Sequence, residues 1–322
     1  MDNMLKKLCP KGMWQQTFFL WVIFFLCISS AQGKETVAVF QPDLRAPYDQ
    51  VFRSIVNGIK EQADFKVSIK KISTDYNQEK LSAWLDKKNV KAIVAFGSRG
   101  LKAAQQTANG RPIMAAASLL SASLLESGNL GGISLAADPE LIMAELKRLS
   151  PSVKKIYTVY SPKHNDWLMQ YASKIAEDYG IELMPLQATD LRQAAIQYKS
   201  VLNELETGRD ALWLPLDPIT VENRTILPLI LRVTWDKNLI VVSSNAPHAK
   251  RGTLFSTFPK NMEMGQSIAK TVNEWLRVGE PQFEIKPLTD LGFAINTRTA
   301  SHLGIKLNKE SLGRYDLMFP QE

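Results

Sequence analysis

The residues of this chain that are most able to do chemistry are polar side chains that follow short apolar runs. Asp217 is one of them, because it stands between Leu216 and Pro218 at the end of such a run. A carboxylate in this setting needs a partner. That partner is either the ammonium group of a ligand or, if Asp217 caps the helix expected after Pro218, the backbone of the chain itself. The sequence leaves both interpretations open.

A second candidate is the segment Gly97-Ser98-Arg99-Gly100, which precedes a predicted helix. Free N–H groups and the helix dipole at a helix start favour a carboxylate or phosphate, and Arg99 can add a bidentate contact. The alternative is a tight turn with a surface arginine. The segment is not the Gly-x-Ser-x-Gly nucleophile elbow of hydrolases, because its serine directly follows the glycine.

The remaining chemical signals indicate neither catalysis nor metal binding. The three histidines, His164, His248 and His302, are too far apart in sequence to suggest a metal site. We expect His164 to form hydrogen bonds in its loop or to contact a ligand, and Trp167 and Trp213 either to stack on a ligand ring or to lie in the core. No nucleotide-binding loop is found. We therefore expect no catalytic residue, no cofactor and no metal.

Alternating strands and helices must position these residues. Short β-branched runs alternate with amphipathic stretches from Lys34 onward, a pattern typical of parallel sheets with helices on both faces. Val51, Ile55 and Ile59 predict the buried face of the first helix. The predicted strands cover 37–40, 65–72, 90–96 and 112–117, then 153–160, 181–186, 211–216 and 239–243. The predicted helices cover 48–62, 77–87 and 100–108, then 167–179, 191–206 and 221–235, and we expect a kink at Pro228 in the last one.

Two further helices suggest how the chain is divided. Asp138 followed by Pro139 predicts a capped helix that begins the second series. A late helix over 261–278, with Met264, Ile268 and Val272 on one face, completes the first lobe if the chain crosses back. The fold class is then α/β, with two doubly wound parallel-sheet lobes joined by a multi-strand hinge. We expect one lobe over 34–119 plus about 253–290 and the other over 120–252 plus about 291–322.

In open parallel sheets, ligands bind beyond the carboxyl ends of the strands, so the residues just after each strand are the candidate ligand contacts. If the predicted strands are correct, all of them face one cleft. On the first lobe they are Gln41, Asp43, Ser98, Arg99, Gly100 and Ser118, and on the second lobe they are His164, Asn165, Asp217, Ser244 and Asn245.

The first 33 residues have the three-part order of a secretory signal peptide. Lys6, Lys7 and Lys11 precede an unbroken apolar run over 18–28, and small residues over 29–33 offer a cleavage site after Gly33. The apolar run is shorter than the roughly 20 residues that span a bilayer, so a permanent anchor is the weaker interpretation. Cys9 and Cys27, the only cysteines, lie in this segment, and we expect a periplasmic mature chain without disulfides.

The composition excludes several classes of protein. With 322 residues, 45% hydrophobic and 22% charged, the chain is long enough for two globular lobes. The net charge is +7, but the lysines are scattered and often stand beside Glu or Asp. A nucleic-acid surface needs a concentrated basic stripe, so we expect no nucleic-acid partner.

Several stretches between Gly131 and Leu307 resemble a known family. They are 132–134, 138–141, 149–156, 161–165 and 214–218, the late helix around Gly265, and the C-terminal segments 295–300 and 303–305. In this order they are similar to the substrate-binding proteins of ABC transporters with the type I periplasmic-binding-protein fold. Two features depart from that family, since Ala117-Ser118-Leu119-Leu120 offers one hydroxyl where a polar pair is common, and Arg99 replaces a small residue.

The resemblance implies a monomeric receptor that captures a small amino-acid-like or anionic ligand between two lobes and delivers it to an ABC permease. No covalent step is expected. One alternative is a ligand-sensing binding protein that works without a transporter. Another is a hydrolase or transferase on a similar fold, which would turn over the bound compound.

Overall fold

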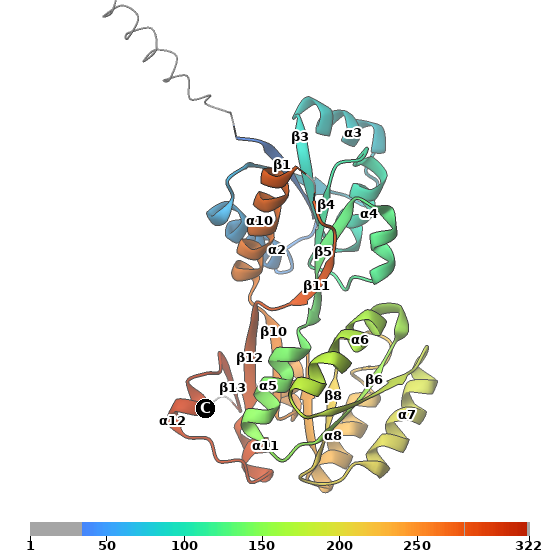
Figure 1. Cartoon of the computed structure of the whole chain (residues 1–322), viewed down its shortest axis with the longest axis vertical. Helices are drawn as coiled ribbons and strands as arrows, with labels where there is room; N and C mark the ends of the chain where they lie inside the picture. Colours follow the sequence, from blue (N-terminus) through green and yellow to red (C-terminus); the bar gives the residue numbers. More distant parts are fainter. Residues whose placement is uncertain (1–33, 280, 321–322) are drawn as a thin grey trace, which may run out of the picture. The chain divides into compact units, whose positions relative to one another are not determined.

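The computed structural model describes residues 34–279 and 281–320. The predicted signal peptide and both cysteines lie outside the described residues. Within the described residues, no helix is both long enough and apolar enough to cross a membrane. Residues Thr36–Glu322 form one compact unit, and it contains two sheets that the chain enters and leaves more than once (Figure 1).

The first sheet has the strand order β11-β5-β4-β3-β1-β2, and all of its paired strands are parallel. Val37 and Val39 of β1 face the helices α2 and α10, whereas Ala38 and Phe40 face α3 and α4. Both faces of the sheet are therefore buried, which explains the nearly continuous apolar strands. The strands are β1 (Thr36–Pro42), β2 (Lys66–Ile72), β3 (Val90–Phe96), β4 (Ile113–Ala116), β5 (Leu130–Ala137) and β11 (Ile285–Leu288), and the helices are α2 (Asp49–Gln62), α3 (Gln78–Lys87), α4 (Gly97–Thr107), the 3-10 turn η1 (Ala122–Ser127) and α10 (Asn261–Val278).

The second sheet has the order β13-β12-β10-β9-β8-β6-β7 and is parallel except where β12 runs against β10. Helices α5 and α6 pack on one face, and α7 and α8 on the other. The strands are β6 (Lys155–Tyr160), β7 (Glu182–Gln187), β8 (Asp210–Leu214), β9 (Ile240–Ser243), β10 (Phe255–Pro259), β12 (Leu291–Asn296) and β13 (Leu317–Phe319), and the helices are α5 (Pro139–Leu149), α6 (Pro162–Asp178), α7 (Leu191–Glu204), α8 (Ile226–Asp236), α9 (Pro247–Arg251), α11 (Thr297–His302) and α12 (Lys309–Leu312).

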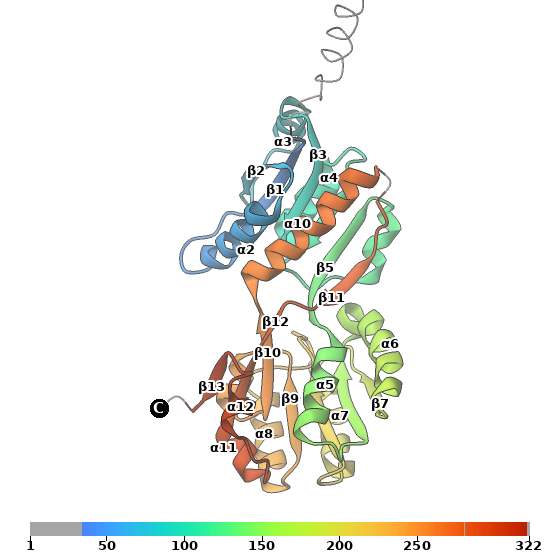
Figure 2. The same ribbon diagram turned by 60° about the vertical axis from the view of Figure 1, so that its left-hand side comes forward.

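These two layered units, here called the first and second lobes, confirm the predicted fold class of two doubly wound α/β lobes. The chain crosses between them three times, after β5, after β10 and after β11 (Figures 1 and 2). The late helix α10 has the predicted bounds and packs on the first lobe, with Met264, Ile268 and Val272 fully buried. Asp138 caps α5 with a 2.9 Å bond from the Glu140 N–H, as predicted.

The crossing points lie later in the chain than the sequence suggested. The first lobe runs to Ala137 and not to 119, because β5 pairs with β4 in the first sheet. The sequence pattern does not predict this strand, because Gly131 and Gly132 interrupt the run of β-branched and apolar side chains. A Cβ on Gly132 would lie 2.5 Å from the Ala115 carbonyl oxygen, so the close approach of β4 requires glycine. Likewise, β10 belongs to the second sheet, so the return crossing lies at Lys260 and not near 253.

Three predictions about helices are wrong. Val51 is 44% exposed, and the buried face of α2 is built from Phe52, Ile55, Val56 and Ile59. Helix α6 begins at Pro162 and not at Trp167, because a proline at the first helical position needs no hydrogen-bond partner for its nitrogen. Helix α8 begins at Ile226 and not at Val221, so Pro228 lies in its first turn and breaks no helical hydrogen bond.

The contact between α2 and α10 fixes the late helix to the first lobe, and both views show these two helices side by side (Figures 1 and 2). A Cβ on Gly265 of α10 would lie 2.1 Å from the Ile55 carbonyl oxygen, and one on Gly58 of α2 would lie 2.0 Å from the Met262 carbonyl oxygen. The two backbones are therefore in direct contact, and any side chain at either glycine forces them apart.

We predict that Gly265→Ala lowers the free energy of unfolding by about 3 kcal/mol, because an extra methyl group has no space against a backbone atom. Thermal unfolding followed by circular dichroism measures the loss. The matched control is Gly313→Ala, whose methyl group would stay 3.5 Å from its nearest neighbour. Equal melting temperatures for the two variants would contradict the close helix contact.

Candidate functional site

The carboxyl ends of both sheets lie at the level of the crossings. Strand β5 ends where the chain passes to α5 of the second lobe, and β1, β3 and β4 run parallel to it. Strand β10 ends where the chain returns to α10 of the first lobe, and β6, β8 and β9 run parallel to it. The residues that follow these strands therefore lie on the sides of the lobes that the crossings join, as expected for a ligand-binding α/β protein.

On the first lobe, three candidates lie in different surroundings. Gln41 is buried within β1, and the exposed Asp43 forms a 3.5 Å ion pair with Lys71 of β2. Ser118 is half-buried, and its hydroxyl donates to the Leu119 carbonyl oxygen at 3.3 Å. Leu119, which follows Ser118, packs against the core beneath α5 and α6 of the second lobe.

The segment 97–100 forms the first turn of α4, which begins directly after β3 at Gly97 with φ of 63°. A Cβ on Gly100 would lie 2.7 Å from the Phe40 carbonyl oxygen, so this turn packs closely on β1. Ser98 is exposed and Arg99 is half-buried. Within the described residues, no carboxylate lies within ion-pair distance of Arg99. Arg99 thus lies in the first turn of a helix and has no ion-pair partner among the described residues, a setting that favours an anion.

On the second lobe, the carboxylate of Asp217 accepts hydrogen bonds from the chain itself. One oxygen takes the Ser161 N–H at 2.7 Å and the Asn165 side-chain amide at 2.9 Å. The other takes the N–H groups of Ile219 and Thr220 at 2.9 and 3.1 Å. Asp217 therefore ties the loop after β8 to the start of α6, and its 3% exposure agrees with this structural role.

Asn165 and His164 lie in the first turn of α6 and not in a loop. The Asn165 side-chain nitrogen donates to Asp217, and this fixes the direction of its oxygen. That oxygen is buried and, among the described residues, has no hydrogen-bond partner. His164 is half-buried. Within the described residues, no three His, Cys, Asp or Glu side chains are grouped as metal ligands would be.

A polar cluster after β9 includes His248, which the sequence did not indicate as a ligand contact. The Ser244 hydroxyl accepts from the indole N–H of Trp213 at 3.0 Å, so Trp213 belongs to the core. His248 is 1% exposed, with Nδ1 2.8 Å from the Ser243 hydroxyl and Nε2 3.0 Å from Asn223 Oδ1. The side-chain nitrogen of Asn245 lies 3.2 Å from the same Nε2. Burial, and secondarily the charge of Arg251, lowers the pKa of His248 to about 4.

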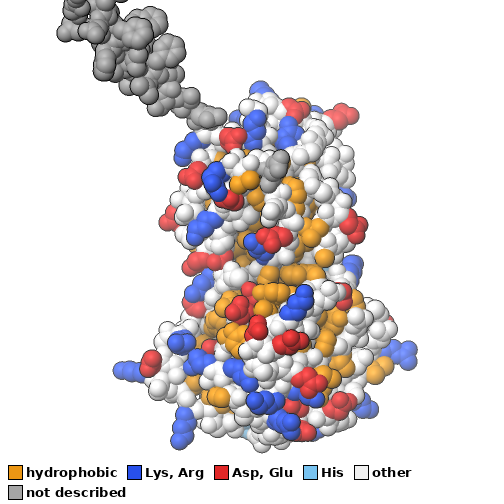
Figure 3. All heavy atoms as spheres, viewed as in Figure 1, with side chains coloured by type: hydrophobic (Ala, Val, Ile, Leu, Met, Phe, Trp, Pro, Cys, Tyr) orange, Lys and Arg blue, Asp and Glu red, His pale blue; other side chains and the backbone are white. Residues whose placement is uncertain are grey.

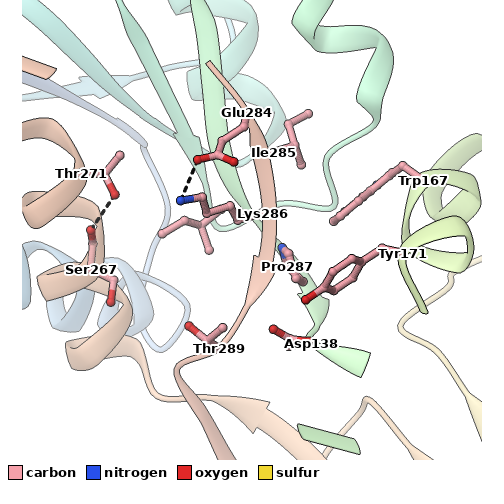
Figure 4. Close-up of a pocket in the computed structure, with 11 residues that line it drawn as sticks. Asp138, Trp167, Tyr171, Ser267, Thr271, Glu284, Ile285, Lys286, Pro287 and Thr289 are labelled. Atoms are coloured by element: carbon pink, nitrogen blue, oxygen red, sulfur yellow. Dashed lines mark hydrogen bonds and ion pairs between the residues drawn. The ribbon is translucent and has the colours of Figure 1, made fainter. Parts of the chain in front are cut away.

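A cavity of about 510 Å³ lies beside the crossings and is lined by both lobes (Figure 4). Trp167 and Tyr171 come from α6, and Asp138 from the first crossing. Opposite them lies an ion pair, with 2.7 Å between Lys286 Nζ and Glu284 Oε1. The lining on this side also includes Ser267, Ile285, Pro287 and Thr289. Hydrophobic side chains gather at this level on the face seen in Figure 3. The sequence analysis named only Trp167 among these residues as a possible ligand contact. The others come together only when the crossings of the folded chain pack beside α6 and α10.

Trp167 also connects the lobes directly. Its indole N–H donates to the Leu120 carbonyl oxygen at 2.9 Å, across from α6 to the loop after β4. The same loop contains Ser118, one of the candidate ligand contacts. Trp167 is therefore neither a pure core residue nor a free stacking platform, and it links the two lobes beside the strand ends.

We predict that Asp217→Ala lowers the free energy of unfolding by about 3 kcal/mol, because several buried donors lose their acceptor. Chemical unfolding of the variant measures the change. The control is Asp43→Ala, where an exposed carboxylate is removed and a change within about 0.5 kcal/mol is expected. If Asp217→Ala keeps its stability and loses only ligand binding, the structural role described above is wrong.

We predict that the protein loses stability on acidification through His248. Its pKa is about 4 in the folded chain and ordinarily 6.5, so the unfolded chain takes up the proton first. The contribution of neutral His248 to the free energy of unfolding is complete above pH 6.5 and is lost as the pH falls toward 4. The largest loss is about 3 kcal/mol. Melting temperatures measured across this range should fall less steeply for His248→Gln, which cannot be protonated. Parallel pH profiles would contradict the prediction.

Comparison with known proteins identifies the family. The model of the ABC transporter substrate-binding protein family matches residues 37–316, which include nearly all of both sheets. Among curated protein sequences, none matches this chain.

Several solved structures share the fold. A conserved domain protein from Vibrio cholerae has a TM-score of 0.54 at 18% identity, covering 88% of this chain and 99% of its own. The ABC domain from Streptococcus pneumoniae in complex with L-Trp also has a TM-score of 0.54 at 18% identity, covering 89% and 100%. An open, ligand-free substrate-binding protein with adhesive properties from Clostridium difficile reaches 0.61 at 13% identity, again covering 89% and 100%. With its two lobes and three crossings matched from 37 to 316, this chain belongs to the ABC transporter substrate-binding protein family.

Proposed function

We propose that this chain captures a small ligand between its two lobes outside the cytoplasm and delivers it to the permease of an ABC transporter. The observation that carries the proposal is the family match, because it runs through both lobes and all three crossings. The placement of polar side chains at the carboxyl ends of both sheets supports it. Export rests on the predicted leader over 1–33, and the proposal includes no covalent step.

We infer that the ligand has a carboxylate that the first lobe recognises. Arg99 is a half-buried residue in the first turn of α4, and its guanidinium has no acidic partner among the described residues. A guanidinium binds a carboxylate through two parallel hydrogen bonds, which fixes orientation as well as charge. Ser98, beside Arg99 on the same turn, is exposed and adds a hydroxyl.

The second lobe supports a ligand that also carries an N–H donor. The Asn165 side-chain oxygen is a buried acceptor without a partner among the described residues, and such groups are costly unless a ligand or water satisfies them. A small amino acid presents both an N–H donor and a carboxylate. The Streptococcus pneumoniae protein was solved with L-Trp, so L-Trp belongs among the first compounds to be tested.

The three crossings supply the hinge that ligand capture requires. A ligand held by Arg99 and by Asn165 contacts both lobes only when they are close, so it binds that arrangement more tightly and shifts the population toward it. The 2.9 Å bond between Trp167 and the Leu120 carbonyl lies beside this region. Tryptophan fluorescence therefore offers a direct readout of lobe movement.

We predict that an amino acid or a small organic anion raises the melting temperature in a thermal-shift screen that includes L-Trp, short peptides and nucleosides. A ligand at a hundred times its dissociation constant adds about 2.7 kcal/mol of stability. Arg99→Gln should weaken the best ligand about tenfold, which removes about 1.4 kcal/mol of that gain. Lys102→Gln, an exposed residue of the same helix, is the matched control.

Two outcomes would count against the proposal. If Arg99→Gln and Asn165→Ala both leave the affinity unchanged, the ligand binds elsewhere. If the ligand is recovered from the protein in altered form, the chain is an enzyme. Capture of a membrane permease by the ligand-loaded protein separates transport from a purely sensory role.

A further inference from the structure

A second cavity, of about 420 Å³, lies in the second lobe at the end remote from the crossings. Helix α8 runs from the carboxyl end of β8 back to the amino end of β9, so its last turn, with Trp235, lies near the amino ends of the strands. Strand β12 is antiparallel to β10 and also ends there, at Asn296. Both views show α8 and α11 at this end of the lobe (Figures 1 and 2). The cavity is thus separate from the strand-end residues proposed to bind the transported ligand.

The lining of this cavity is strongly basic. Its lining includes one carboxylate, Asp236, and four cations, which are Arg232, Lys250, Arg251 and Arg298. Within the described residues, none of these four cations has a carboxylate within the 4.0 Å that defines an ion pair, whereas nine other lysines and arginines do. Cations that are gathered without partners repel one another, and a bound anion relieves that repulsion.

Polar contacts join the two short helices that carry three of the basic residues. The Asn296 side chain donates to the Ala249 carbonyl oxygen at 2.7 Å, and the Thr299 hydroxyl donates to the Gly252 carbonyl oxygen at 3.1 Å. These bonds join α9 to α11, so Lys250 and Arg251 on one short helix keep a fixed relation to Arg298 on the other.

Aromatic stacking restrains Arg298 further. Its guanidinium carbon lies 5.4 Å from the centre of the Trp235 ring, and that ring stacks on His302 with 3.7 Å between ring centres. The Arg251 guanidinium donates to Asn223 Oδ1 at 3.4 Å, which is a neutral acceptor. Two of the four cations are therefore already restrained before a ligand binds, and the entropy that binding costs at these two side chains is reduced.

We propose that this cavity is a binding site for a phosphate-bearing ligand, distinct from the transported solute. Three guanidinium groups with one ammonium match a group that carries more than one negative charge and several acceptor oxygens, because each guanidinium binds two oxygens at once. The phosphate belongs either to a free small molecule or to a lipid headgroup at a membrane surface. Both present the same chemistry, and the experiment below separates them.

The test uses inorganic pyrophosphate as the soluble probe, titrated into the purified chain by calorimetry at constant ionic strength. The expected result is saturable binding of one pyrophosphate per chain. Arg251→Gln and Arg298→Gln should each weaken it roughly tenfold, since each removes charge-assisted hydrogen bonds. Arg192→Gln is the matched control, because it removes the same charge from an exposed position on α7 of the same lobe.

A second arm measures co-sedimentation with phosphatidylglycerol vesicles, with phosphatidylcholine vesicles for comparison. If the two cavity variants lose vesicle binding and pyrophosphate competes with the vesicles, the ligand is a lipid headgroup. If pyrophosphate binds but the vesicles do not, it is a free molecule. The proposal is overturned if neither probe binds, or if Arg192→Gln weakens binding as much as the cavity variants do. Because the substituted side chains are exposed, unchanged melting temperatures confirm that the variants are folded.

Discussion

The structure depends on the way in which its three crossings are bonded to one another. The Asp138 N–H on the first crossing donates to the Leu288 carbonyl oxygen on the third at 3.0 Å. The Lys260 N–H on the second donates to the Asp290 carbonyl oxygen, also on the third, at 2.8 Å. The Lys260 ammonium in addition lies 2.9 Å from Asp316 Oδ1. The crossings therefore form one bonded unit, and this unit brings the carboxyl ends of both sheets to the same level.

Hydrogen bonds also connect the loop with Ser118, a candidate ligand contact, to this unit and to the second lobe. The loop after β4 is bonded to β5, because the Leu120 N–H donates to the Ser134 hydroxyl at 3.1 Å and the Leu135 N–H to the Ser118 carbonyl oxygen at 2.9 Å. Trp167 joins the same loop to α6 of the second lobe. A displacement of Ser118 thus acts on the first crossing and on the opposite lobe at once. Hydrogen bonds therefore connect this candidate contact to both lobes.

The sequence predicted the parts of this fold that local patterns determine. The apolar strands, the Asp138 cap and the buried face of α10 follow from burial and periodicity, and the structure confirms them. The sequence did not predict features that depend on contacts with residues far away in the chain. Strand β5 contains adjacent glycines because β4 approaches it closely, and no local pattern indicates that neighbour. Val51 looked buried by its spacing, whereas α10 covers the adjacent face of α2.

The same limit applies to the sites. The positions after the strands were predictable, since the carboxyl ends of parallel strands meet at one edge. The bonds from the Ile219 and Thr220 N–H groups to Asp217 agree with the backbone partner that the sequence left open. The bonds from Ser161 and Asn165 were not predictable, because these donors lie more than fifty residues earlier in the chain. The basic cavity was also invisible in the sequence. Arg232 and Arg298 are 66 positions apart and meet only because α8 and β12 end at the same edge of the sheet.

The separation of core and site explains how this fold persists at low sequence identity. The solved relatives share 13–18% of residues with this chain, yet the match extends over 88–89% of it. The strands need only apolar side chains on both faces and small residues where backbones touch, as at Gly132 and Gly265. The polar residues lie at strand ends and helix starts, where a substitution leaves the strand cores intact. Arg99 and the loop with Ser118 occupy such positions, so a substitution there leaves the strand cores of both lobes unchanged.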